Sequence, residues 1–185
     1  MSIYNQERIV AIRHDKEDVA GTLPELFDEL NMKLEIIDVD GSLPDPQELR
    51  LLVILGSPES AYDHRLPWLE KELAWLKGVL AARVPTLAIC FGSQLLARAL
   101  GGQVYKNSEA EIGWTNIDCV AAEAESNLAN AILGPWLNFH FDAFSVPPTA
   151  ELLGKTELAS QVFKQGTAMG VQFHPEINVE MYDTW

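Results

Sequence analysis

Residues 86–102 read TLAICFGSQLLARALGG, and they place a short apolar run directly before a helical pattern. The run at 86–89 is typical of a buried strand, because no charge interrupts it. Small and helix-favouring residues follow over about 92–100 and end in two glycines, the usual end of a helix. The stretch therefore predicts a strand, a sharp turn at Cys90 and a helix.

The same alternation of apolar runs and helical stripes extends toward the N-terminus. The pentad LLVIL at 51–55 is uninterrupted, as expected for a parallel strand that is covered on both faces. Strands joined by helices form a parallel sheet with right-handed crossovers. We therefore expect a flavodoxin-like α/β fold, an open, mostly parallel twisted sheet with helices on both faces. The expected strands are 8–13, 34–39 and 51–55, and the expected helices are 20–31 and 66–83.

The second half of the chain is richer in strands and lacks convincing helices between the last of them. Its expected strands are 114–120, 161–163 and 168–173. We interpret them as the far edge of the same sheet with antiparallel additions. No repeat or linker-like segment interrupts the chain, so residues 1–185 are interpreted as a single domain.

The chain is strongly acidic, because 13 Lys and Arg stand against 27 Asp and Glu, a net charge of −14. Such a charge argues against binding to nucleic acid or to an anionic membrane surface. The composition, 48% apolar and 22% charged, is that of a globular domain and excludes disorder. There is no signal-peptide pattern, no membrane-spanning run and no zinc-ligand spacing. Two cysteines are too few for a disulfide framework. We therefore expect a cytoplasmic protein without a metal or another cofactor.

Cys90 is the candidate nucleophile. It lies at the apex of the expected turn, and the small residues Ala88 and Gly92 flank it two positions to either side. The turn directs the N-terminus of the following helix at the sulfur, which favours the thiolate. A lone cysteine after a strand is more often a packing residue, so the interpretation also needs a base.

The segment His174-Pro175-Glu176 supplies a candidate base at the end of another expected strand. A proline favours extended backbone in the residue before it, and residues two apart in extended chain project to the same side. Glu176 can therefore hold one ring nitrogen of His174 while the other faces Cys90.

Five segments now carry a resemblance to a known family. They read LGSPESAYD at 55–63, PTLAICFGSQLL at 85–96, EIGW at 111–114, HFD at 140–142 and GVQFHPE at 170–176. These segments resemble, in the same order, those of the class I (triad) glutamine amidotransferases. The closest likeness is to stand-alone members similar to the amidotransferase domain of GMP synthetase.

The resemblance implies a hydrolase of the glutamine side-chain amide. In that reaction Cys90 would attack the γ-carbonyl, His174 would protonate the departing ammonia and Glu176 would orient His174. Water would then release glutamate from a γ-glutamyl thioester. The backbone N–H groups of Ser57 and Phe91 would hold the oxyanion.

The resemblance also assigns four residues to substrate binding. Gln94 matches the family residue that contacts the amino-acid end of the substrate, and a helix residue without a ligand is the alternative. The full set is Gly56, Gln94, His140 and Phe141.

Four features depart from the family pattern. Ala88 replaces a glycine, a change that a tight turn tolerates. Ser57 replaces another glycine and costs roughly 1–2 kcal/mol if the position needs a positive φ. Phe141 replaces the glycine of a His-Gly-Asp segment, so its ring either narrows the pocket or turns into the core. The sequence ends at Trp185, and we expect the family's C-terminal extension to be lacking and an apolar patch to be covered by a partner or a second copy of the chain.

Two of three further residues carry open interpretations. His14 either lines the mouth of the site or belongs to a solvated loop. Glu111 is either a buried structural carboxylate or a residue that reaches the cleft. Cys119 is expected to serve packing.

Three functions are compatible with these observations. The leading hypothesis is hydrolysis of glutamine that supplies ammonia to a separate synthetase. The second is hydrolysis of another γ-glutamyl amide or peptide, motivated by Phe141. The third is a catalytically silent binding or regulatory module, motivated by the short C-terminus.

Overall fold

The computed structural model describes residues 7–16, 19–120 and 126–185. Its strands are β1 (Arg8–Arg13), β2 (Leu34–Asp38), β3 (Leu49–Ile54), β4 (Thr86–Ile89), β5 (Val104–Thr115), β6 (Asp118–Cys119), β7 (Trp136–Phe144), β8 (Glu151–Lys155), β9 (Ser160–Gln165) and β10 (Ala168–Val171). Its helices are α1 (Leu23–Glu29), the 3-10 helix η1 (Pro46–Glu48), α2 (Leu69–Ala81), α3 (Phe91–Ala99), α4 (Ser126–Ile132) and α5 (Val179–Thr184). In the described part of the chain, no helix is long and apolar enough to span a membrane.

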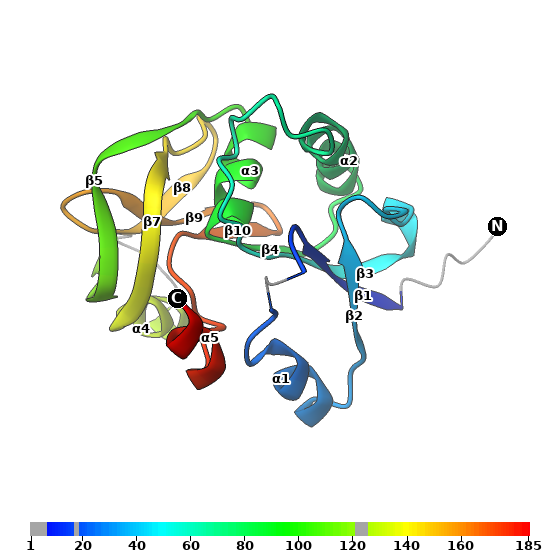
Figure 1. Ribbon diagram of the computed structural model, residues 1–185, viewed down its shortest axis with the longest axis horizontal. Coiled ribbons are helices and arrows are strands. Elements are labelled where there is room, and N and C mark those ends of the chain that lie inside the picture. Colours follow the sequence, from blue (N-terminus) through cyan, green and yellow to red (C-terminus); the bar gives the residue numbers. More distant parts are fainter. Residues whose placement is uncertain (1–6, 17–18, 121–125) are drawn as a thin grey trace.

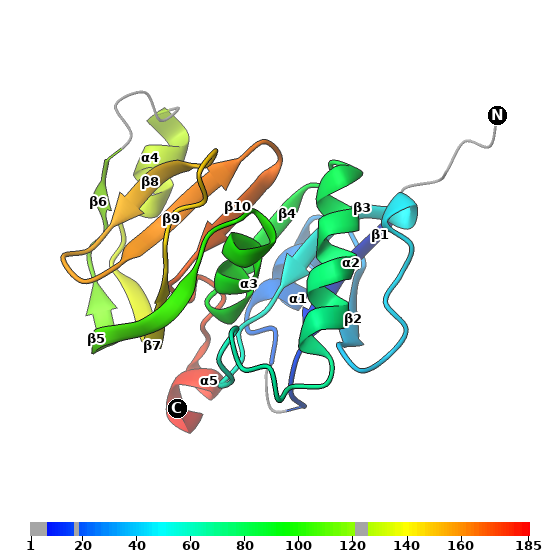
Figure 2. The ribbon, with the colours of Figure 1, turned by 90° about the horizontal axis from the view of Figure 1, so that it is seen from above.

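An eight-stranded sheet runs through the molecule in the order β2-β1-β3-β4-β10-β9-β8-β6. The first five strands in this order, β2, β1, β3, β4 and β10, pair in parallel. The last three, β9, β8 and β6, extend the sheet through antiparallel pairs. Figure 1 shows α2 and α3 on one face and α1 and α4 on the other. Seen from above, α2 and α3 lie next to each other across the strands (Figure 2). The expected open, mostly parallel sheet with antiparallel additions is confirmed.

Burial on both faces explains the uninterrupted apolar runs. In β1, Val10 and Ile12 belong to the hydrophobic cluster on the α2 and α3 side, whereas Ile9 and Ala11 belong to the cluster on the α1 side. Their alternation is the two-residue period of a strand. Because both faces are covered, both sets of side chains must be apolar, and the run shows no polar positions.

A second sheet, formed by β5 and β7, lies beside α3 (Figures 1 and 2). The two strands pair antiparallel, with an irregularity between Lys106 and Glu111. The backbone N–H of His174 donates a hydrogen bond of 2.9 Å to the carbonyl oxygen of Leu137 in β7. This bond joins the small sheet to the segment that follows β10.

The second half contains more elements than the sequence predicted. The expected strand 114–120 is the end of β5 followed by the short β6, and β7, β8, α4 and α5 were not expected. Strand β7 buries three polar residues, Asn138, His140 and Asp142. Their presence removes the apolar alternation by which a strand is recognised in sequence.

Candidate active site

Three neighbouring strands, β3, β4 and β10, end at one edge of the large sheet. Gly56 lies after β3, Cys90 after β4 and His174 after β10. All three line one cavity of about 810 Å³, a volume within the range of small-molecule pockets. An open parallel sheet binds ligands beyond the carboxyl ends of its strands, and the cavity lies there.

Cys90 occupies the apex of a strained turn between β4 and α3. Its backbone has φ 51° and ψ −110°, a conformation that non-glycine residues rarely adopt. A Cβ at position 92 would clash with the carbonyl oxygen of Ile54, so the close approach of α3 to β3 requires Gly92. Ser93 Oγ donates to the carbonyl oxygen of Cys90 at 2.6 Å. The turn thus fixes Cys90 at the N-terminus of α3, where the sequence predicted it.

His174 is held between Glu176 and Cys90. Its Nδ1 lies 2.7 Å from Oε1 of Glu176, and both side chains are buried. Burial lowers the pKa of His174, but the negative charges of Cys90 and Glu176 outweigh it and raise this pKa to about 10. The interaction with the Cys90 side chain is the first of the causes that raise this pKa, so the two side chains lie close together. The three predicted catalytic side chains therefore meet, with an imidazolium facing the sulfur.

The residues expected to form the oxyanion hole lie on either side of Cys90. A Cβ at Gly56 would lie 3.2 Å from Cε1 of His174 and 3.8 Å from Cβ of Cys90, so this backbone passes directly beside both side chains. Ser57 and Phe91 also line the cavity. Ser57 is not among the described non-glycine residues with positive φ. The strain considered for a serine at this position is therefore absent.

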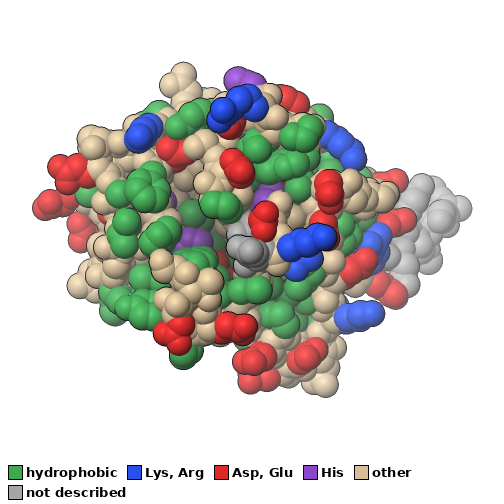
Figure 3. Space-filling view, viewed as in Figure 1, with side chains coloured by type: hydrophobic (Ala, Val, Ile, Leu, Met, Phe, Trp, Pro, Cys, Tyr) green, Lys and Arg blue, Asp and Glu red, His purple; other side chains and the backbone are tan. Residues whose placement is uncertain are grey.

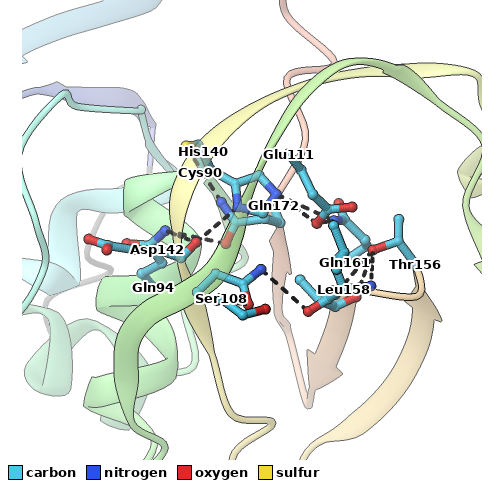
Figure 4. Close-up of polar contacts among 12 residues, drawn as sticks. Cys90, Gln94, Ser108, Glu111, His140, Asp142, Thr156, Leu158, Gln161 and Gln172 are labelled. Carbon is cyan, nitrogen blue, oxygen red and sulfur yellow. Dashed lines mark hydrogen bonds and ion pairs between the residues drawn. The ribbon is translucent and has the colours of Figure 1, made fainter.

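Two glutamine side chains link Cys90 to β7 through hydrogen bonds. Gln172 Nε2 donates to Sγ of Cys90 at 3.6 Å. Gln94 Nε2 donates to Oε1 of Gln172 and to the carbonyl oxygen of Asp142, both at 3.3 Å. Figure 4 shows this arrangement beside Cys90. Gln94 lines the cavity as expected, but Gln172 was not singled out, because a glutamine in a strand-end segment carries no pattern of its own.

Asp142 is a further cavity residue to which the sequence assigned no role. Its carboxylate accepts hydrogen bonds from Ser60 Oγ at 2.6 Å and from the Tyr62 hydroxyl at 3.1 Å. These bonds tie the turn after β3 to β7 across the cavity. Gly56 and Ser57 belong to the same turn, so Asp142 supports the loop that borders Cys90.

His140, expected to bind substrate, uses both ring nitrogens within the protein. Nδ1 lies 2.9 Å from the carbonyl oxygen of Asp142, and Nε2 lies 3.1 Å from Oε2 of Glu111 (Figure 4). Glu111 also accepts from Gln161 Nε2 at 2.9 Å. Burial raises the pKa of Glu111, but hydrogen bonds from His140, Thr156 and Gln161 lower it overall. Of the two alternatives for Glu111, the buried structural carboxylate is the one observed.

Phe141 lies at the rim of the cavity. Its side chain is 54% exposed and lines the cavity, and its ring meets Phe139 edge-on at a centroid distance of 6.3 Å. Trp185, also a lining residue, meets the His174 ring edge-on at 4.7 Å. Figure 3 shows hydrophobic side chains gathered on this face over β5 and β7, with a histidine visible among them. The alternative that Phe141 turns into the core is wrong.

His14 follows β1, and its side chain is fully buried against that of Glu72. The alternative of a solvated loop histidine is wrong, because the ring is buried and hydrogen-bonded to the carbonyl of Gly56. His14 is not among the cavity-lining residues either, so it lies behind the site rather than at its mouth. It contacts the ring of Phe91, one of the cavity residues. The sequence could not show this burial, since Glu72 and Gly56 are far from His14 along the chain.

Comparisons with known proteins lead to glutamine amidotransferases. The family model described as "Glutamine amidotransferase class-I" matches residues 17–184. GMP synthase from Brachyspira hyodysenteriae is 29% identical over 160 residues, which are 80% of this chain, and the chain spans only 29% of the length of that enzyme. A glutamine-hydrolysing GMP synthase subunit from Sulfolobus acidocaldarius is 28% identical over 151 residues, 80% of this chain and 78% of that relative. The crystal structure of a glutamine amidotransferase from Thermotoga maritima matches with a TM-score of 0.88 and 30% identity, covering 97% of this chain and 80% of that one.

Proposed function

This chain belongs to the class I glutamine amidotransferase family, and from that premise we propose that it hydrolyses the side-chain amide of glutamine through a γ-glutamyl thioester. The ammonia then passes to a separate acceptor enzyme. One observation carries the proposal: Cys90, His174 and Glu176 come together in a cavity at the carboxyl edge of the sheet. A nucleophile, a base that touches it and a carboxylate that orients the base are the parts required for covalent amide hydrolysis.

In the first half of the reaction, Sγ of Cys90 forms a bond to Cδ of glutamine, and the carbonyl electrons move onto the oxygen. The N–H groups of Ser57 and Phe91 hold this oxyanion, and one such donor contributes about 100- to 1000-fold to the rate. His174 gives its proton to the amide nitrogen as the C–N bond breaks. Ammonia leaves, and the γ-glutamyl group remains as a thioester on Cys90.

In the second half, His174 is neutral and acts as the base. It takes a proton from water, the hydroxide attacks the thioester carbonyl, and the C–S bond breaks to release glutamate. The Cys90 thiolate and the His174 imidazolium are then restored. Throughout, Glu176 fixes the ring through Nδ1, which leaves Nε2 directed at the reacting atoms.

We propose an acceptor on a second polypeptide, in the cytoplasm, where thiols such as Cys90 stay reduced. The relative from Sulfolobus acidocaldarius is named as one subunit of GMP synthase, which supports this arrangement. Cys90, His174 and Glu176 all come from this one chain, so a homo-oligomer is the alternative assembly rather than a requirement of the chemistry.

A second candidate function is hydrolysis of a larger γ-glutamyl amide or peptide. The observation that favours it is the half-exposed Phe141 ring on the rim of the cavity, where the family has a glycine. The ring restricts the space beside the β7 backbone and offers an apolar surface to a larger substrate.

Two measurements test the proposal. A glutamine-mimicking diazo-ketone is expected to label Cys90 stoichiometrically, seen by mass spectrometry, while a Cys90→Ala variant is not labelled and a Cys119→Ala variant is. Release of ammonia is then measured for glutamine, γ-glutamyl amines and γ-glutamyl peptides. If kcat/KM is highest for glutamine, the result supports glutamine hydrolysis. If kcat/KM is higher for a larger compound, it supports hydrolysis of a γ-glutamyl amide or peptide. If Cys90 is not labelled and no substrate is turned over, the chain is a catalytically silent module.

A further inference from the structure

A buried His–Glu pair lies beneath the turn that borders the nucleophile. Nδ1 of His14 lies 3.2 Å from the carbonyl oxygen of Gly56. Nε2 lies 3.1 Å from Oε1 and 3.2 Å from Oε2 of Glu72, in the first turn of α2. Both side chains are 0% exposed. Neither residue touches the reacting atoms in the mechanism above, so this buried polar pair needs another explanation.

The partners of His14 determine which of its nitrogens donates. The Gly56 carbonyl can only accept a hydrogen bond, so Nδ1 must carry a proton. The hydrogen bond between Nε2 and the Glu72 carboxylate needs one proton, which can sit on Nε2 or on Glu72. Whichever of the two groups holds that proton, Nδ1 is the donor to Gly56. Glu72 thus fixes the rotation of the ring, and the Gly56 carbonyl requires the proton on the nitrogen that faces it.

The bond to Gly56 fixes the direction of the next N–H group. The carbonyl of Gly56 and the N–H of Ser57 belong to one peptide unit, and in the described residues the cis peptide bond is Gly134–Pro135. In a trans peptide the C=O and the N–H point in opposite directions. Because the Gly56 carbonyl points toward His14, the Ser57 N–H points away from His14. The hydrogen bond that the carbonyl accepts also polarises the N–H of the same peptide unit.

The other side of this turn faces the catalytic side chains. A Cβ on Gly56 would lie close to both Cys90 and His174, at 3.8 Å and 3.2 Å. The ring of His14 also packs on that of Phe91, with centroids 4.6 Å apart. The His14 side chain therefore contacts the carbonyl of the Gly56–Ser57 peptide unit and the ring of Phe91. The N–H groups of Ser57 and Phe91 are the two assigned to the oxyanion hole.

We propose that His14, oriented by Glu72, is a positioning residue that aims the oxyanion hole. It holds the Gly56–Ser57 peptide and the first residue of α3 in the geometry that receives the developing negative charge. The inference rests on the proposed amide hydrolysis and extends it to two residues outside the triad. Its energetic basis is preorganisation, since a donor that is already aimed does not have to reorient during the reaction.

The test compares two replacements of His14. His14→Phe keeps a ring but removes the donor, and His14→Asn keeps an N–H donor at the same number of bonds from Cα as Nδ1. We expect His14→Phe to lower kcat for glutamine at least about tenfold with KM nearly unchanged, and His14→Asn to keep most of the activity. His64→Phe is the matched control, because that histidine is 77% exposed and should leave kcat unaltered.

Alkylation of Cys90 by iodoacetamide distinguishes aiming of the hole from damage to the turn. Displacement of iodide forms no oxyanion, so its rate should be equal in the wild type, His14→Phe and His14→Asn. A folded His14→Phe variant with wild-type kcat overturns the proposal, and so does one in which turnover and alkylation fall together. If His14→Phe does not fold, His14→Gln takes its place, because its amide lies one bond farther from Cα and does not match Nδ1.

A measurement that does not depend on turnover can test this inference even if the proposed function is wrong. If the wild type hydrolyses neither glutamine nor another γ-glutamyl amide, the proposed function is wrong. The aim of the Ser57 N–H is then followed through its backbone amide resonance in a ¹H–¹⁵N spectrum. We expect a large shift in the variant without the donor and a small one in His14→Asn, and equal shifts would overturn the inference.

Discussion

Nδ1 of His174 lies 2.7 Å from Oε1 of Glu176, across the proline that separates the two residues. The pair is local in sequence, and it is also fixed from outside. The carbonyl oxygen of Glu176 accepts the backbone N–H of Thr22 at 2.8 Å, so the segment before α1 anchors the carboxylate residue. With Nδ1 held, the imidazole ring can turn only one edge to Cys90. The anchored Glu176 therefore fixes the orientation of the His174 ring.

Cys90→Ala should abolish hydrolysis with little loss of stability. The turn accepts a small residue, but the reaction loses its nucleophile. Cys119 is half-buried in β6, away from the cavity-lining set, and Cys119→Ala should keep full activity. Ammonia release and thermal unfolding of both variants check this. If activity were lost only in Cys119→Ala, the active site would not be at Cys90.

Replacing Cys90 should lower the pKa of His174. The charge of Cys90 is the largest of the interactions that raise this pKa to about 10, and burial then acts with less opposition. The raised pKa also means that protonation of His174 contributes stability fully below its ordinary value of 6.5, a contribution that is lost as the pH rises through about 10.

The measurement is a pH titration of the imidazole ¹⁵N resonances in the wild type, Cys90→Ala and Glu176→Gln. We expect the pKa of His174 to fall in both variants, and further in Cys90→Ala. The ¹⁵N resonances of the exposed His64 serve as the internal reference in all three proteins. A pKa of His174 that is unchanged in Cys90→Ala would mean that the two side chains do not interact.

Glu111→Gln should destabilise the protein at neutral pH and much less in acid. Hydrogen bonds from His140, Thr156 and Gln161 lower the pKa of Glu111 against the effect of its burial. A lowered pKa contributes stability above the ordinary value of 4.5, and this contribution is lost as the pH falls through the lower, folded value.

Urea unfolding at pH 7 and pH 3.5 checks this prediction. The loss in unfolding free energy should be about 1–3 kcal/mol at pH 7 and should shrink at the lower pH. Glu109→Gln, an exposed position on the same strand, is the control and should change neither value. Equal losses at both pH values would show that the carboxylate charge of Glu111 contributes nothing.

The parts of the molecule that the sequence predicted correctly have local signals. The strand and helix around Cys90, the apolar run at 51–55 and the spacing of His174 and Glu176 each lie within one short segment. Their structure follows from periodicity, turn geometry and the effect of a proline, all of which act between near neighbours.

The parts that could not be predicted depend on partners far away in the chain. Strand β7 escapes recognition because it buries Asn138 and His140, and His140 is satisfied only by residues of other segments. His14 and Gln172 are ordinary polar residues in sequence. Their positions against Gly56 and Cys90 exist only once the strands are side by side.

Phe141→Gly tests whether the rim selects the substrate. In the family pattern a glycine lets the substrate approach the backbone here, whereas the Phe141 ring stands on the rim, 54% exposed. If the ring obstructs free glutamine, its removal should raise kcat/KM for glutamine at least about tenfold, which corresponds to about 1.4 kcal/mol of transition-state binding. Any preference for a bulkier γ-glutamyl compound should fall at the same time.

Trp114→Gly provides the matched control for this substitution, because Trp114 is 56% exposed on the neighbouring strand β5 and is not a cavity-lining residue. Both variants lose an exposed aromatic ring from the same small sheet and gain a flexible glycine, so a general loosening of that sheet should affect them alike. A rise in kcat/KM confined to Phe141→Gly therefore assigns selection to the ring itself. If kcat/KM for glutamine is unchanged or lower in a folded Phe141→Gly variant, Phe141 is no gate, and plain hydrolysis of glutamine is the function that the site supports.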